Sequence, residues 1–316
     1  MSRAQLDSAD VTAPRITRAL RDGRLDRVAH GVYDLLPVPF AERVRDPDLR
    51  RDDIYDHRRR RPVWLGMLAH GPDAVAVGQS ALVLHDVEGL PVQPLVEVTR
   101  LDRRGRVAHD GIVLRRYEAA RWYQTVHDRL VVPVDLALAQ AVPSLDRRHA
   151  VAVMDSVLHR QLLTDLGLAG AHDLARGRRS VERTHDWWDV ADGRAESPAE
   201  TFARLSCIDE GVPPDVLQQV FLPRQGRRVR VDMAWWLGRG RWLINEVDGR
   251  EAHSSPEPLF HDRARQNLLT ASGHTVLRHS GADAWAGRPG REIAAQLAKE
   301  GWAPGRAVPR GPFPLS

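Results

Sequence analysis

The sequence predicts a mixed α/β protein built from several domains, and three observations support this fold class. A chain of 316 residues is about two average domains long, so more than one core is expected. Stretches with apolar residues at helical spacing alternate with stretches patterned like strands. Charged or Pro/Gly-rich segments separate these regions. The predicted domains are residues 1–60, 61–175 and 196–303, with a linker at 176–195 and a loose tail at 304–316.

The composition is that of a soluble globular protein. Hydrophobic residues make up 42% of the chain and charged residues 28%, and no apolar run approaches the ~18 residues of a membrane span. The first residues, MSRAQLDSAD, lack the apolar core of a secretory signal. Cys207 is the single cysteine, so no internal disulfide can form. We expect a cytoplasmic protein with no membrane partner.

Arginine dominates the basic residues. Of 46 lysines and arginines, only Lys299 is a lysine, and the sequence pI is about 9.8. Arginine suits bidentate phosphate contacts, so this bias permits nucleic-acid binding. Genomic base composition is an alternative explanation of the same bias.

The first segment predicts a winged helix. Thr12 can cap a helix with Pro14 in its first turn, and apolar residues then follow at helical spacing until Gly23. The next residues, GRLDRVAHGVYDL, predict two short strands joined by a turn. The opposite face of the helix carries the candidate DNA-binding residues Arg15, Thr17, Arg18 and Arg21. The alternative is a solvated basic face in a protein-interaction module.

This helix and the following "GRL.RV..GVY" string resemble the amino-terminal domain of AbiEi-family antitoxins, over about Leu6 to Leu35. The resemblance implies a DNA-reading element and leaves open a toxin or another protein partner. The middle segment, with expected helices at 63–68, 136–141 and 150–158 and expected strands at 96–100 and 111–117, is similar to the region that follows in those proteins. It contains no catalytic constellation, and Trp122 and Tyr123 are expected in its core.

The third segment carries the residues with chemical potential. It begins with a predicted helix at Ser197-Pro198, which places Glu200 in the first turns. Strands are predicted at 216–221, 228–236 and 242–247. The turn GRGR joins the last two as an antiparallel hairpin. Alternation along the hairpin lets Asp232 and Glu246 point to the same side near one end.

Two adjacent carboxylates raise each other's pKa and destabilise the fold unless a positive charge lies between them. A divalent metal can supply that charge, and Mg²⁺ (or Mn²⁺) prefers such hard oxygen ligands. Bound Mg²⁺ can also provide a water that attacks a phosphodiester. The alternative is that arginines such as Arg230 or Arg241 form salt bridges with these acids.

The strings RVRVDMAWW, LINEVDGREAH, FHDRARQNLL and GHTVLRHS resemble endonuclease domains related to very-short-patch-repair (Vsr) nucleases, over about 90 residues. These domains belong to the PD-(D/E)xK branch of the restriction-endonuclease-like fold. By resemblance Asp232 and Glu246 bind the metal, Glu200 is the helix glutamate, and Asp248 takes the place of the ExK lysine. His253 is the candidate proton-transfer or phosphate-contacting residue. Arg263, Arg265 and Gln266 lie on the helix behind the site and are candidate DNA contacts.

Two functions therefore compete. The first is a DNA-binding protein with a Mg²⁺-dependent endonuclease domain, which the intact Asp232 and Glu246 favour. The second is a transcriptional regulator or antitoxin-like protein with an inactive nuclease fold, which the missing ExK lysine favours. The fold alone does not decide between them.

Overall fold

The structure is a computed structural model that describes residues 1–34, 54–101, 111–115, 122–223, 228–248, 268–309, 311 and 313–315. Helices and strands are mixed along the chain, as predicted. The chain divides into two compact units. One comprises Met1–Asp146 and Leu162–Asp189, and the other comprises Arg147–Gln161 and Val190–Ser316. No helix in the described ranges is both long and apolar enough to cross a membrane.

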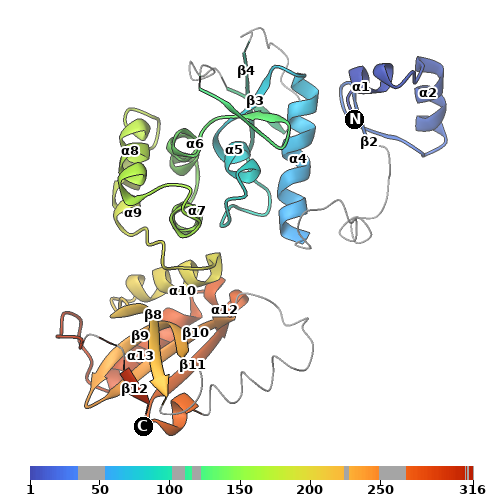
Figure 1. Cartoon of the computed structure of the whole chain (residues 1–316). Helices are drawn as coiled ribbons and strands as arrows, with labels where there is room; N and C mark the ends of the chain where they lie inside the picture. The colour runs from blue at the N-terminus through green and yellow to red at the C-terminus, as the bar shows by residue number, and fades with distance from the viewer. Residues whose placement is uncertain are drawn as a thin grey trace. The chain divides into compact units, whose positions relative to one another are not determined.

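The amino-terminal part of the first unit is a pair of helices followed by a hairpin (Figure 1). Helices α1 (Arg3–Ser8) and α2 (Ala13–Arg21) precede the antiparallel strands β1 (Asp26–Ala29) and β2 (Val32–Asp34). Pro14 lies in the first turn of α2 as predicted, but the Thr12 side chain makes no capping hydrogen bond. The small core of this part consists of Leu6, Ile16, Leu25 and Tyr33.

A five-stranded sheet forms the centre of the first unit. Its order is β5 (Ile112–Leu114), β4 (Val96–Arg100), β3 (Ala74–Ala76), β7 (Arg129–Val131) and β6 (Gln124–Val126). Helices α4 (Ile54–His70), α5 (Gly78–Leu84) and α6 (Val134–Ala141) accompany it. The expectation that Trp122 and Tyr123 are core residues is wrong, because they are 71% and 45% exposed. They precede β6 at the edge of the sheet.

The rest of the first unit lies within and beside the predicted linker. Helix α8 (Asp165–Ala175) packs on α6, and the short elements η3 (Glu182–Thr184) and α9 (His185–Asp189) follow. Trp187 and Trp188, within the predicted linker, are buried. The indole ring of Trp188 stacks on the His172 ring.

Helix α7 (Arg147–His159) belongs to the second unit, where it packs on α10 (Pro198–Asp209). Asp155 on α7 is fully buried and accepts hydrogen bonds from the Thr201 hydroxyl and the Arg204 guanidinium on α10, each at 2.7 Å. The backbone N–H of Asp192 donates to the same carboxylate. Burial raises the pKa of Asp155, and these three donors stabilise its charge.

The second unit contains a five-stranded sheet in the order β11 (Thr275–Ser280), β10 (Arg241–Asp248), β9 (Val229–Gly238), β8 (Val216–Pro223) and β12 (Phe313–Leu315). Strands β8, β9 and β10 are antiparallel neighbours, which confirms the predicted hairpin, and β11 runs parallel to β10. Helices α10, α12 (Gly281–Trp285) and α13 (Arg288–Lys299) complete the unit.

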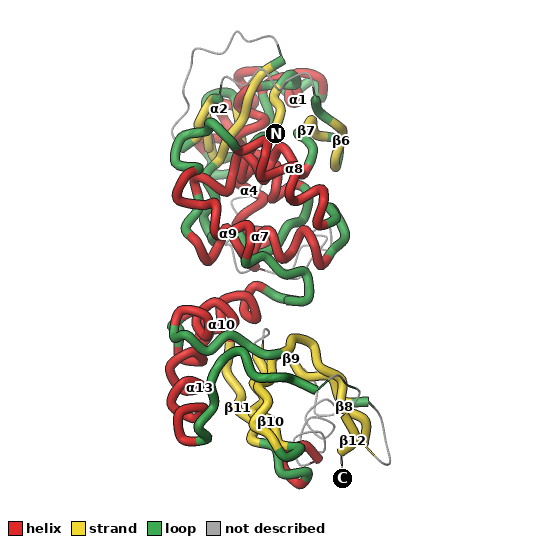
Figure 2. Tube along the Cα trace, turned by 90° about the vertical axis from the view of Figure 1, so that its left-hand side faces the viewer, coloured by secondary structure: helices red, strands yellow, loops and turns green. Residues whose placement is uncertain are grey.

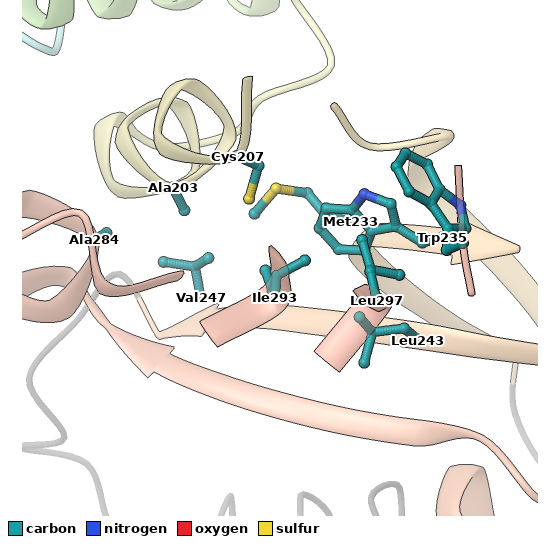
Figure 3. Packing of buried hydrophobic residues seen from close by; sticks show 10 residues of the cluster. Ala203, Cys207, Met233, Trp235, Leu243, Val247, Ala284, Ile293 and Leu297 are labelled. Atoms are coloured by element: carbon teal, nitrogen blue, oxygen red, sulfur yellow. The ribbon is translucent and has the colours of Figure 1, made fainter. Parts of the chain in front are cut away.

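Helices α10 and α13 cover one face of this sheet (Figure 2). Met233 and Trp235 from β9 and Leu243 from β10 pack there against Cys207 and Ile293 (Figure 3). Cys207 is the buried small hydrophobe expected from its neighbours, and burial raises the pKa of its thiol to about 12.

The other face of the sheet holds a second cluster around Phe221, Trp242 and Ile244. Phe313 packs against this cluster, with its ring 4.9 Å from that of Trp242 and stacked on that of Trp236. The expectation of a loose tail is therefore wrong for Phe313–Leu315, because the aromatic side chain is held by the cluster and the backbone pairs with β8. Trp235 and Trp236, adjacent on β9, pack on opposite faces of the sheet.

Candidate active site

The first part of the candidate site is the amino-terminal turn of α10, where Ser197 caps the helix and Pro198 occupies its first turn. Three donors hold the Glu200 carboxylate. The Glu196 N–H and the Gln218 side-chain amide each donate to Oε2 at 3.0 Å, and the Ser197 hydroxyl donates to Oε1 at 2.9 Å. Glu200 is thus placed where the sequence predicted it, and its orientation is fixed.

Glu200 lies close to Asp232. Burial raises the pKa of Glu200 to about 7, and the negative charge of Asp232 contributes to the increase, against the lowering effect of the Glu196 N–H. A carboxyl group that titrates near neutral pH can serve in proton transfer, and such groups are concentrated at functional sites.

Asp232 lies at an irregular point of the sheet. Pairing between β8 and β9 includes Leu217 with Met233 and Gln219 with Val231, and Gln218 and Asp232 are the intervening residues of the two strands. Gln218 has a φ of 52°, a left-handed conformation that non-glycine residues seldom adopt. Backbone conformations of this kind are found preferentially at functional sites.

The Asp232 side chain reaches the neighbouring strand β10. Its Oδ2 accepts a hydrogen bond of 2.8 Å from the backbone N–H of Val247, the residue that follows Glu246. Asp232 and Glu246 therefore lie at the same end of the hairpin. Glu246 is buried, with 5% of its surface exposed.

A basic residue from β11 adjoins Glu246. The parallel register pairs Glu246 with Arg278, and the Arg278 guanidinium lies 3.8 Å from Glu246 and 3.1 Å from Asp248. Asp248 is more exposed than Glu246.

Arg230 pairs with Glu196 at 2.6 Å, and Arg241 pairs with Glu300 at 3.0 Å. Arg278 is the cation that the structure places beside Glu246 instead.

The described residues contain no group of three or more His, Cys, Asp or Glu side chains arranged to hold a metal ion. The donors present are nevertheless hard oxygen atoms, which suit Mg²⁺ or Mn²⁺. Mg²⁺ is commonly bound through only one or two carboxylates and keeps several waters. Asp232 and Glu246 fit that limited requirement, and Glu200 lies close to Asp232. The other predicted site residues, His253, Arg263, Arg265 and Gln266, lie outside the described residues.

Two residues of this region were not identified from the sequence. Gln218 was missed because it lies in a strand pattern, and nothing in VLQQVF distinguishes one glutamine from the other. Arg278 is part of the string GHTVLRHS, which carried the family resemblance without an assigned role for its arginine. Their positions depend on strand register, which is fixed by the assembled sheet.

The predicted DNA-reading face lies on α2. Ile16 is buried, whereas Arg15, Thr17, Arg18 and Arg21 are exposed. Thr17 bonds to the carbonyl of Ala13, and Arg21 bonds to Asp22. Within the described ranges Arg15 and Arg18 have no ion-pair partner, so their guanidinium groups are available to phosphates.

Comparison with known proteins gives relatives without a described activity. Two uncharacterized proteins from two strains of Mycobacterium tuberculosis are each 29% identical to this chain over 295 residues. The aligned region covers 92% of this chain and 97% of each relative. No family model matches, and no solved structure matches.

Proposed function

We propose that this protein binds DNA through its amino-terminal segment and hydrolyses DNA phosphodiester bonds with Mg²⁺ or Mn²⁺ at Asp232 and Glu246. The observation that carries the proposal is the position of Asp232, which adjoins the Glu200 carboxylate and the strand residue next to Glu246. Glu200 from α10 lies close to Asp232 on β9, and Asp232 bonds to the β10 backbone beside Glu246. These groups come from three separate elements.

The order of elements supports the same proposal. The Vsr-like pattern runs from a glutamate helix through a strand with aspartate and a strand with ExDG to a helix and a closing strand. In this chain α10, β9 and β10 are followed by helical residues 268–271 and then by β11 parallel to β10. The amino-terminal helices and hairpin, with exposed Arg15 and Arg18, are compatible with a winged helix that locates DNA.

The chemistry assigned to the site is hydrolysis. A bound divalent cation would supply an activated water and stabilise negative charge on the phosphate. Attack by the water oxygen forms a bond to phosphorus, and the bond from phosphorus to one bridging oxygen breaks. Glu200, whose pKa is raised to about 7, can accept the water proton near neutral pH.

Arg278 can supply the positive charge that the missing ExK lysine would provide. Nucleases of the PD-(D/E)xK type use the ammonium group of that lysine to orient the water or to offset developing charge, whereas Asp248 occupies its place here. The guanidinium of Arg278 lies against both Glu246 and Asp248. It provides a fixed positive charge in this region, although arginine cannot act as a base.

The contact between Arg278 and Glu246 also favours the regulator function. With Arg278 3.8 Å from Glu246, the carboxylate is partly neutralised without a metal. In that case the domain would bind DNA or a protein partner, such as a toxin, without cleavage. The two functions differ in their requirement for a divalent cation.

The deciding experiment incubates the full-length protein with supercoiled plasmid and Mg²⁺, Mn²⁺ or EDTA. We expect nicking or linearisation with either metal and none with EDTA. Asp232→Asn should reduce cleavage by on the order of 10²-fold or more, because Asn keeps an acceptor for the Val247 N–H but loses the charge.

The matched control is Glu300→Gln, which removes a carboxylate paired with Arg241 on the surface of the same unit. This variant should cleave like the wild type. Cleavage that survives Asp232→Asn would assign the activity to a contaminant or another site. A wild-type protein that neither cuts DNA nor binds Mn²⁺ would favour the regulator function.

A further inference from the structure

Gln218 is the residue around the carboxylates whose conformation calls for an explanation. Its side-chain Nε2 lies 3.0 Å from Glu200 Oε2 and donates a hydrogen bond to it. Its Oε1 is buried and has no hydrogen-bond partner among the described residues. A buried acceptor without a partner is destabilising, so its presence needs a compensating cause.

The backbone of Gln218 is also in an unfavourable conformation. The φ of 52° is in the left-handed region, where a residue with a long side chain is destabilised. Unfavourable backbone conformations of this kind cluster at functional sites. Gln218 lies between the β8 residues that pair with Met233 and Val231, and its amide reaches Glu200.

We infer that Gln218 is a positioning residue of the proposed metal site, holding the Glu200 carboxylate toward Asp232 through its amide N–H. Its buried carbonyl oxygen is then the acceptor for a water at that site. This inference rests on the proposed function, because it presupposes that Asp232 takes part in binding a divalent cation. The inference adds the uncharged Gln218 to the carboxylates Glu200, Asp232 and Glu246 of the proposed site.

The neighbouring Gln219 supplies a matched comparison. Its side-chain amide donates to the backbone carbonyl of Val220 at 2.8 Å instead of to a carboxylate. Gln218→Leu and Gln219→Leu therefore remove the same chemical group from adjacent positions of one strand. Only the first variant removes a donor to Glu200.

The experiment measures Mn²⁺ affinity of the full-length protein by electron paramagnetic resonance of the free ion, without DNA. Gln218→Leu should weaken binding by about 10- to 100-fold, the range for residues that support a metal site from outside its ligands, while Gln219→Leu binds like the wild type. In a Glu200→Gln background, Gln218→Leu should cause little additional loss if it acts through Glu200. A merely structural role would not produce this coupling.

Gln218→Asn guards against loss of folding. Asparagine tolerates the left-handed conformation better than glutamine, but its shorter side chain cannot reach Glu200. This variant should melt at or above the wild-type temperature and still bind Mn²⁺ weakly. Wild-type affinity in both Gln218→Leu and Gln218→Asn would overturn the inference and leave the proposed function standing. Absence of Mn²⁺ binding in the wild type would instead overturn the metal site itself.

Discussion

At the residue scale, Glu200 belongs both to the amino-terminal cap of α10 and to the candidate site. As the third residue of α10 it is bonded to the cap of its own helix, and such a carboxylate is ordinarily stabilised in its charged form. Burial and the charge of Asp232 outweigh this stabilisation and raise its pKa to about 7. The ionised form of Glu200 therefore destabilises the fold above neutral pH.

This position predicts a pH dependence of stability. Because the pKa of Glu200 is raised from 4.5 to about 7 on folding, its contribution to stability is fully present below pH 4.5. That contribution is lost as the pH rises through 7. Glu200→Gln should remove this dependence and increase the free energy of unfolding at pH 8 by about 1 to 3 kcal/mol relative to the wild type. Urea unfolding in EDTA between pH 4.5 and 8.5 measures the difference.

Asp283→Asn is the control for that series, because Asp283 caps the short helix α12 through Ser280. Hydrogen bonds from Ser280 lower the pKa of Asp283. The contribution of Asp283 to stability is therefore lost as the pH falls, whereas that of Glu200 is lost as the pH rises. The pH profile of Asp283→Asn should keep the decline of the wild type above neutral pH. Parallel profiles for the wild type and Glu200→Gln would show that Glu200 ionises normally.

At the scale of elements, local sequence patterns were sufficient for most helices and strands of the second unit. Ser197-Pro198 marked the start of α10, and the turn GRGR marked the β9–β10 hairpin, because caps and tight turns are encoded by a few adjacent residues. The pairing of Phe313 with β8 and the exposure of Trp122 were not predictable in this way. Both depend on which strand lies at the sheet edge.

The residues of the candidate site fall into the same two groups, those indicated by local sequence patterns and those that depend on the assembled sheet. The acids Asp232, Glu246 and Glu200 stand in recognisable strings, so the sequence identified them. Gln218 and Arg278 reach the site through strand register and through an irregularity at one position. These depend on side chains from three strands at once and leave no local pattern.

Helix α2 carries the prediction about DNA binding at this scale. Replacing Arg15 and Arg18 together by Ala should weaken binding to duplex DNA and reduce the slope of log affinity against log salt by about 2, as two phosphate contacts are lost. Fluorescence anisotropy over a range of salt concentrations measures both quantities. The two arginines are exposed and have no ion-pair partner in the described part of the chain.

A charge-matched control removes Arg3 and Arg24 instead. These arginines belong to the same segment but pair with Asp7 and Asp22. Their double replacement changes the net charge equally and should leave the salt slope nearly unchanged. Equal effects of the two double variants would reduce the role of α2 to general electrostatic attraction, and no effect of either would remove the first segment from DNA binding.

At the scale of the whole molecule, the second unit is assembled from two separate stretches of chain. Helix α7 comes from the region predicted as the middle domain, yet its Asp155 is buried against Thr201 and Arg204 of α10. Gly193 packs so closely on Leu158 that a Cβ atom there would lie 2.7 Å from the Leu158 side chain. The His159 ring lies 3.2 Å from the carbonyl of Gly193. The ends of the two stretches are therefore adjacent.

This arrangement predicts how fragments fold. Residues 190–316 alone would leave the buried Arg204 without Asp155, and breaking such a buried pair costs about 3 to 5 kcal/mol. Joining Arg147–Gln161 to Val190 through a short Gly/Ser linker should restore a cooperative urea transition, whereas the shorter fragment should unfold at lower urea or bind a hydrophobic dye. The same fusion with Asp155→Leu tests whether the ion pair or only the helix is required, since it removes the acid but keeps apolar packing. Equal stability of the fragments with and without α7 would show that residues 190–316 form a complete domain.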